Sequence, residues 1–208
     1  MLAVDLINRV SRILNDEEDG ARRWGQSELL EWLNDGQREV VLHRPDASVK
    51  SVEFTCINNT RQTLPEEALS LVDVVRNTDG TPIFQMASLE WGCLDHGMES
   101  DRIDLFSFDE RNPRAFYLHP IPDAGSVVEL VYSVLPQEVV VTDFDGDASL
   151  LSISAIYANA VLDYMLFRAL QKEDDAASSS RAAAHYEAFL TSLAGKRAAD
   201  KEISSEPV

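Results

Sequence analysis

Apolar residues near the start of the chain recur every three or four positions. One repeat spans residues 3–14, and a second begins near Ser27 and ends before Pro45. This spacing places side chains on one face of an α-helix, so the pattern predicts two amphipathic helices. The second stripe includes Gln37 and contains Gly36, which costs about 1 kcal/mol relative to alanine. We interpret Gly36 as a tolerated loss, the alternative being that another backbone passes close to it.

Two further helical patterns lie near the other end of the chain. Residues 153–171 are apolar on most of the helix circumference, so this helix should be covered on several sides and form the central rod of the core. A second stripe spans residues 182–193. Asp174 and Asp175 suit the positive end of that helix, and Gly195 suits its end.

The middle of the chain has the period of two that is typical of half-buried strands. Residues 49–56 alternate in this way, and Asp79-Gly80 is a strong turn signal between residues 71–76 and 83–86. Residues 115–119 and 127–134 form a second expected hairpin around a proline-rich turn. Residues 137–141 are expected to be a last extended piece.

Because one amphipathic helix pair cannot cover its own apolar stripe, the two terminal pairs are expected to pack together. The predicted fold class is α+β: a four-helix bundle of residues 1–46 and 148–195, an inserted antiparallel β region at 47–147, and a flexible C-terminal arm at 196–208. The residues expected in the bundle core are Leu6, Ile7, Val10, Leu33, Ile156, Ala160, Tyr164, Tyr186 and Phe189.

The balance of charges bears on the kind of partner. With 45% apolar and 26% charged residues the composition is that of a globular protein, yet 36 acids face 18 basic residues, a formal charge of −18. That charge argues against a protein that grips phosphate backbones. It fits either an acidic soluble surface, or a face that stays slippery to DNA or meets a basic partner. With no apolar run long enough for a membrane span and no basic-then-apolar leader, we expect a soluble, unexported protein.

Few residues are candidates for site chemistry. Asp143, Asp145 and Asp147 form an oxygen-rich loop, but Ala148 stands where the EF-hand pattern needs glycine, and Ser154 where it needs glutamate. We therefore interpret this segment as an ordinary acidic connection and predict no metal site.

The cysteines and histidines support no site either. Cys93 and His96 have zinc-like spacing without a second such pair, and Cys56 with Cys93 is too few for a disulfide framework, so we expect free thiols. No phosphate loop, serine elbow or paired histidines at helical spacing is present. The prediction is a protein that is not an enzyme and binds no cofactor.

Several stretches resemble a known family. Residues 157–173 and 181–189, the strand and proline turn at 116–122, and residues 28–37 are similar to the head-to-tail adaptor proteins of short-tailed bacteriophages, the group that includes tail tubular protein A. The resemblance spans residues 3–195.

The resemblance implies a structural virion protein in the phage neck, assembled in the host cytoplasm. It implies a ring of roughly twelve copies between the portal protein and the tail nozzle protein, through which DNA passes without specific binding. An acidic channel would let the genome slide. It also implies a C-terminal arm that grips the portal, here Lys196, Arg197, Lys201, Ile203 and Val208.

Two other functions stay open at this stage. An acidic inhibitor that mimics DNA and binds a host protein fits the charge, but not the well-patterned core and the β region. An enzyme with an unrecognised site is the second, because two carboxylates can meet in a fold without leaving a sequence motif.

Overall fold

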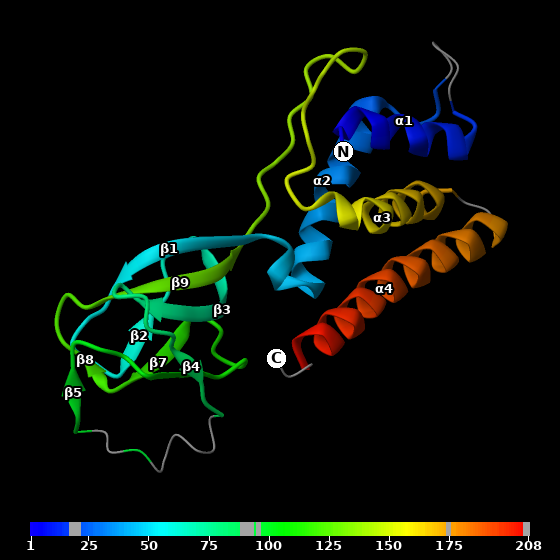
Figure 1. Ribbon diagram of the computed structural model, residues 1–208. Helices are drawn as coiled ribbons and strands as arrows, with labels where there is room; N and C mark the ends of the chain where they lie inside the picture. Colours follow the sequence, from blue (N-terminus) through cyan, green and yellow to red (C-terminus); the bar gives the residue numbers. More distant parts are fainter. Residues whose placement is uncertain (17–21, 88–93, 95–96, 174–175, 206–208) are drawn as a thin grey trace. The chain divides into compact units, whose positions relative to one another are not determined.

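The chain divides into two compact units, each with its own core. The computed structural model describes residues 1–16, 22–87, 94, 97–173 and 176–205. The helical unit comprises Met1–Ala47 and Pro136–Val208, and the β unit comprises Ser48–Leu135 (Figure 1). The expected β insertion ended at Asp147. The structure places residues 136–147 with the helices instead, for a reason given in the next subsection.

The first two helices have the expected boundaries to within a few residues. Helix α1, Ala3–Leu14, buries one face of apolar side chains, and Asn15 ends it in the left-handed conformation. Before helix α2, Gln26–His43, the Asp16 carboxylate accepts hydrogen bonds from the backbone N–H groups of Arg23 and Trp24. A short 3-10 turn, Pro45–Ala47, ends the first part of the helical unit.

Helix α3, Ala158–Gln171, packs against α1, α2 and α4, as its apolar circumference predicted. It is preceded by a 3-10 turn, Ala155–Tyr157. That turn overturns one prediction, because Ile156 was expected in the core and is 61% exposed. The helical spacing that assigned Ile156 to the stripe holds only from Ala158 onward.

Gly36 lies on the face of α2 that packs against α3. A Cβ atom built there would lie 3.1 Å from Tyr164 Cδ1 and 3.2 Å from Val161 Cγ1. The interpretation of Gly36 as a tolerated loss is therefore wrong. Its missing side chain makes room for α3, although the groups that come close are side chains and not a backbone.

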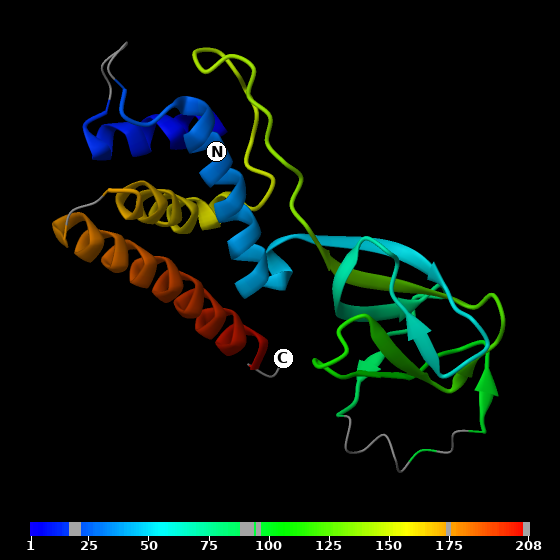
Figure 2. The same ribbon diagram turned by 180° about the vertical axis from the view of Figure 1, so that it is seen from behind.

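Helix α4, Ala176–Ser205, is more than twice as long as α3 (Figures 1 and 2). The expected helix end at Gly195 is therefore wrong, because the helix continues to Ser205. One internal glycine costs only about 1 kcal/mol, and helix-forming residues such as Ala198 and Ala199 follow it. Asp174 and Asp175, expected to begin this helix, lie outside the described residues.

Most of the residues expected in the core of the helical unit are buried, although Tyr186 is only half-buried. The Tyr186 ring still stacks on Phe189 at 5.9 Å and lies 4.9 Å from the Phe167 ring. The fully or nearly fully buried members of the expected set are Leu6, Ile7, Val10, Leu33, Ala160, Tyr164 and Phe189.

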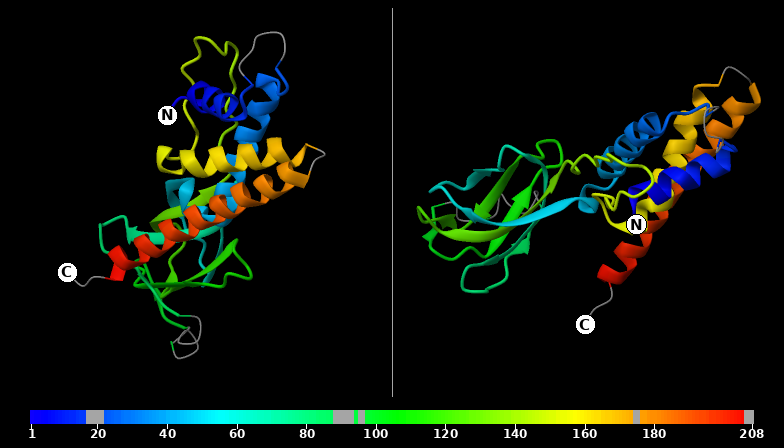
Figure 3. Two further views of the ribbon diagram at one scale, coloured as in Figure 1. Left: turned by 90° about the vertical axis from the view of Figure 1, so that its right-hand side faces the viewer. Right: turned by 90° about the horizontal axis from the view of Figure 1, so that it is seen from above.

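The four helices do not all run side by side, since α2 crosses α3 in two views (Figures 1 and 3). Together with the strands, they make the fold mixed α+β, as expected. Within the described part of the chain, no helix combines the length and the apolar character needed to cross a bilayer.

The β unit holds two larger sheets with a shared core. In the first, β9 (Val127–Val134) pairs antiparallel with β1 (Val49–Thr55) on one side and with β3 (Ala68–Asn77) on the other. The second has the order β2-β7-β6-β4, and a small third sheet pairs β5 with β8. The bounds of these strands are Arg61–Thr63 for β2, Phe84–Gln85 for β4, Glu99–Ser100 for β5, Leu105–Phe108 for β6, Ala115–His119 for β7 and Ile121–Pro122 for β8.

The core of the β unit lies between the two larger sheets. Alternate residues along most of β1 and β9 point into it, as the period of two predicted. Strand β3 instead buries about every third residue, because register shifts interrupt its pairing with β9. The largest fully buried members of this core, taken from both sheets and the adjoining loop, are Tyr132, Phe106, Phe116, Ile103, Leu118 and Leu130.

The hairpin expected around Asp79-Gly80 forms as a short antiparallel return, in which the Asn77 N–H donates to the Thr81 carbonyl at 2.9 Å and the Ile83 N–H to the Val75 carbonyl at 3.1 Å. The hairpin expected between residues 115–119 and 127–134 is wrong. β7 and β9 lie in different sheets, because β1 and β3 occupy both edges of β9. After the turn at Gly80, where φ is +88°, the chain makes one bridge from Arg76 to Pro82. It then joins the second sheet, where β4 runs parallel to β6, so the region is antiparallel only in part.

Candidate interaction surfaces

A long irregular segment, residues 136–153, extends past α1 before it returns to α3 (Figure 1). We call it the loop. The expected extended piece at its start forms no strand. Instead, the side chain of Asn34 on α2 pairs with Val139 in both directions, accepting from its N–H at 2.9 Å and donating to its carbonyl at 3.0 Å. This pairing explains why the start of the loop belongs to the helical unit.

A second amide side chain on α2 holds the returning end of the loop. The Gln37 carbonyl oxygen accepts from the N–H of Ser152 at 2.7 Å and from that of Ile153 at 3.3 Å. Gln37 is fully buried, and its amide nitrogen donates to Asn34 at 3.4 Å. The two ends of the loop are thus joined through two neighbouring side chains of one helix.

The first residues of the chain are paired with the loop. The Ala3 N–H donates to the Ser149 carbonyl at 2.9 Å, and the Leu151 N–H donates to the Met1 carbonyl at 3.2 Å. These bonds flank an antiparallel bridge between Leu2 and Leu150. The two sides of the loop are also tied to each other, since the Ser149 hydroxyl donates to the Val140 carbonyl at 3.1 Å.

The tip of the loop carries the three aspartates considered as calcium ligands. Asp143 accepts from the N–H of Asp145, and Asp147 accepts from the N–H groups of Ser149 and Thr142. The hydrogen bonds from Ser149 are the main cause that lowers the pKa of Asp147. These carboxylates therefore order their own backbone.

No three His, Cys, Asp or Glu side chains are placed to hold a metal ion in the part of the chain that the structure describes. The zinc-like pair Cys93 and His96 lies outside that part. Cys56 is a free, buried thiol, and burial raises its pKa to about 11. At neutral pH this sulfur is protonated and a poor nucleophile.

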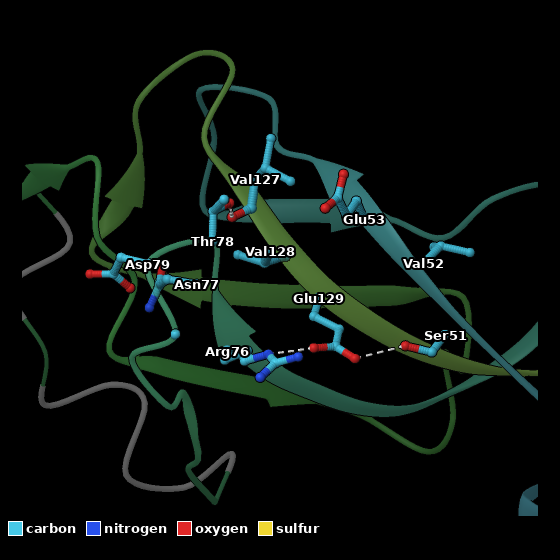
Figure 4. A pocket seen from close by; sticks show the side chains of 11 residues that line it. Ser51, Val52, Glu53, Arg76, Asn77, Thr78, Asp79, Val127, Val128 and Glu129 are labelled. Atoms are coloured by element: carbon cyan, nitrogen blue, oxygen red, sulfur yellow. Dashed lines mark hydrogen bonds and ion pairs between the residues drawn. The ribbon is translucent and has the colours of Figure 1, made fainter.

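A groove of about 560 Å³ lies on the outer face of the β1-β9-β3 sheet (Figure 4). At its centre Glu129 accepts from the Ser51 hydroxyl at 3.0 Å and from Arg76 Nε at 2.6 Å. Glu53 is opposite Glu129 in the strand register, but its carboxylate points away from this pair, which lessens their repulsion.

The side chains at the centre of this groove are poorly suited to catalysis. The hydrogen bonds from Ser51 and then Arg76 lower the pKa of Glu129, so its carboxylate is a poor base for activating the Ser51 hydroxyl. A groove with a stabilised carboxylate and a neutral hydroxyl suits polar contacts better than catalysis.

Several large apolar side chains are exposed in each unit. On the β unit they are Val49, Ile57, Phe84, Met98 and Leu135. On the helical unit they are Met1, Ile13, Leu42, Val140, Leu150 and Ile156. Single exposed apolar residues are normal, but Met1, Val140 and Leu150 come from chain segments that are bonded to one another.

The expected portal-binding arm forms the last turns of α4. Lys196, Arg197, Lys201 and Ile203 are helical, their side chains lie outside the described ones, and Val208 is not described. The last buried side chain described on α4 is Leu193. The contacts of the five arm residues therefore lie outside what the structure describes.

Asn34 and Gln37 were missed as functional residues. Gln37 carried a signal, because it occupies a position in the apolar stripe of α2, where a polar side chain must find a buried partner. Asn34 is adjacent to the stripe and looked like an ordinary surface residue. Neither pattern indicates which distant backbone the amide binds.

Comparison with known proteins identifies a family for the chain. The family model described as "SU10 adaptor protein" matches residues 1–208. A search of curated proteins finds no match.

Proposed function

The chain belongs to the SU10 adaptor protein family, a family of structural bacteriophage head-to-tail adaptors and not of enzymes, and on this premise we propose that it forms a ring in the virion neck. The ring would hold roughly twelve copies, the number that the resemblance described above implies, with the closed cyclic symmetry that is common among homo-oligomers. Its partners would be the portal protein on one side and the tail nozzle protein on the other. Assembly would take place in the host cytoplasm.

The observation that carries this proposal is the extent of the family match. It covers both compact units, so the helical and the β unit belong to one adaptor chain. Two bodies with separate cores offer two separate contact surfaces, which suits a protein that joins two others. In the ring we propose that α1 to α4 act as one four-helix bundle around α3, which already packs against the other three.

The charge supports a channel through which DNA slides. Each chain carries a formal charge of −18, so a ring of such chains repels phosphate even after salt screens much of the field. We propose that DNA passes without specific binding. A basic channel lining in an assembled ring would contradict this part.

We also propose that the last turns of α4 bind the portal. The helix continues beyond Leu193 to Ser205, and a helix can lie in a groove of a partner. The proposed contacts are Lys196, Arg197, Lys201, Ile203 and Val208.

Electron microscopy of the chain mixed with its phage's portal protein tests the ring directly. We expect a closed ring on the portal, with both units resolved in each copy. A chain truncated after Gly195 should fold but attach weakly, and Arg181→Ala, on the solvent side of α4, is the control that should attach normally. Unchanged attachment of the truncated chain would remove the arm from the proposal, whereas failure of the full chain to join the portal or the nozzle would remove the proposed function.

A further inference from the structure

The loop presents an apolar patch to solvent. Val140 is 66% exposed and Leu150 62%, and Met1 is exposed beside them in the bonded network described above. We call Met1, Val140 and Leu150 the loop patch. Burying a large apolar side chain is worth about 1.5–3 kcal/mol, so leaving two of them in water forgoes a substantial gain in stability.

The exposure of the loop patch is not a result of a loose backbone. Asn34 holds the residue before Val140, Gln37 holds the end of the loop, and the Leu2 bridge holds Leu150. Two buried amide side chains are thus committed to keeping an irregular segment in place. A surface ordered before binding loses less entropy when a partner covers it.

The acidic tip indicates the chemistry of the partner. Asp143, Asp145 and Asp147 follow closely after Val140, so an apolar contact and a negative charge lie on the same projecting segment. A complementary surface is apolar with lysine or arginine at its border. DNA is excluded by its charge, and a second copy is a poor match because 36 acids outnumber 18 basic residues in this chain.

We propose that the loop patch and its acidic tip dock into an apolar groove, bordered by lysine or arginine, on a different virion protein. The inference rests on the proposed function for the presence of such a protein in the neck. It assigns to the loop a contact of its own, in addition to the one proposed for the end of α4.

The test measures binding of the full chain to two probes in turn, the portal protein and the tail nozzle protein of the same phage. The variant Val140→Ser/Leu150→Ser keeps the backbone bonds of the loop and removes its apolar atoms. We expect about a tenfold or larger loss of affinity for one of the two probes, since 1.4 kcal/mol corresponds to tenfold. The matched control is Leu42→Ser/Ile156→Ser, which alters two equally exposed side chains away from the loop and should bind normally.

A charge variant tests the tip independently. Asp145→Lys should weaken binding to the same probe, and added salt should weaken binding of the unaltered chain more than that of the variant. Glu187→Lys, an exposed change on α4, is its control. Circular dichroism establishes that each variant is folded before its binding is compared.

Three results would overturn the inference. Normal binding of both loop variants to both probes would do so while leaving the adaptor function intact. A loss confined to assembly of the chain with itself would identify a second copy as the occupant. If the unaltered chain bound neither probe, the proposed function would fail together with the inference.

Discussion

Each of the two units contains a buried asparagine side chain that pairs with both backbone groups of one distant residue. In the helical unit, Asn34 pairs with both backbone groups of Val139, 105 residues away. In the β unit, Asn77 pairs in the same way with Ile103, at 2.8 and 2.9 Å. In each pair the amide side chain bonds a backbone N–H and a backbone carbonyl, as a neighbouring strand would do.

The surroundings of these two pairs differ. Next to Ile103, the Asp104 N–H bonds to the His119 carbonyl and the β6-β7 ladder follows. Around Val139 the backbone is irregular, and amide side chains on α2 carry much of its bonding. From this comparison we expect a buried polar side chain to contribute most to stability where regular secondary structure does not hold the backbone.

The largest expected effect is on the core of the helical unit. Phe189→Ala removes a fully buried ring that lies 5.7 Å from both the Tyr164 and His43 rings, so we expect a loss of about 3–5 kcal/mol in the free energy of unfolding. Urea unfolding followed by circular dichroism measures it. Phe84→Ala, the same truncation at a position 63% exposed on the β unit, should cost far less. An equal cost would show that burial does not govern either effect.

The comparison between the two amides is tested by Asn34→Ala and Asn77→Ala. Leaving both backbone groups of Val139 unpaired should cost at least about 2 kcal/mol, since each buried unsatisfied group costs about 1–3 kcal/mol. We expect Asn77→Ala to cost less, because the neighbouring ladder still holds the chain. Hydrogen exchange should show faster exchange across residues 136–153 in the Asn34 variant. A larger cost for Asn77→Ala would break the comparison.

A smaller effect is expected at Gly36. Alanine gains about 1 kcal/mol in helix propensity but forces its Cβ against Tyr164 and Val161, an overpacking that costs about 1–3 kcal/mol. We expect Gly36→Ala to be destabilising by about 1 kcal/mol, measured as a shift in the unfolding midpoint. Gly195→Ala is the control: its Cβ meets nothing within 4 Å, so it should stabilise α4. Stabilisation by both substitutions would contradict the close packing of α2 on α3.

The smallest effect concerns pH and the polar groove. The Glu129 pKa is lowered in the folded state, so its contribution to stability is present above the unfolded pKa and is lost as the pH falls through the folded pKa. Glu129→Gln should therefore flatten the acid side of the stability profile of the β unit. Glu53→Gln, a change on the neighbouring strand, is the control, and equal profiles for the two variants would contradict the role of Ser51 and Arg76.

Much of the secondary structure follows from short-range patterns. Residues 3–14, 115–119 and 127–134 match α1, β7 and β9, because apolar period and turn residues act over a few positions. The pairing of β7 and β9 did not follow, since nothing in either strand states that β1 and β3 will take both edges of β9.

Some features of the candidate surfaces could likewise be predicted from the sequence, and others could not. Composition and local pattern indicated an acidic chain without catalytic chemistry, and the resemblance to phage adaptors agrees with the family match. The clamp of Asn34 and Gln37 on the loop was not foreseeable, because it joins residues more than a hundred positions apart.

The sequence by itself determined most of the helices and the longer strands, the acidic charge and the adaptor family. Only the tertiary structure decided which strands pair, why Gly36 is glycine and what holds the loop in place. The physical reason is that periodicity and charge are properties of neighbouring residues, whereas partner choice depends on which surfaces remain uncovered once the rest of the chain has packed.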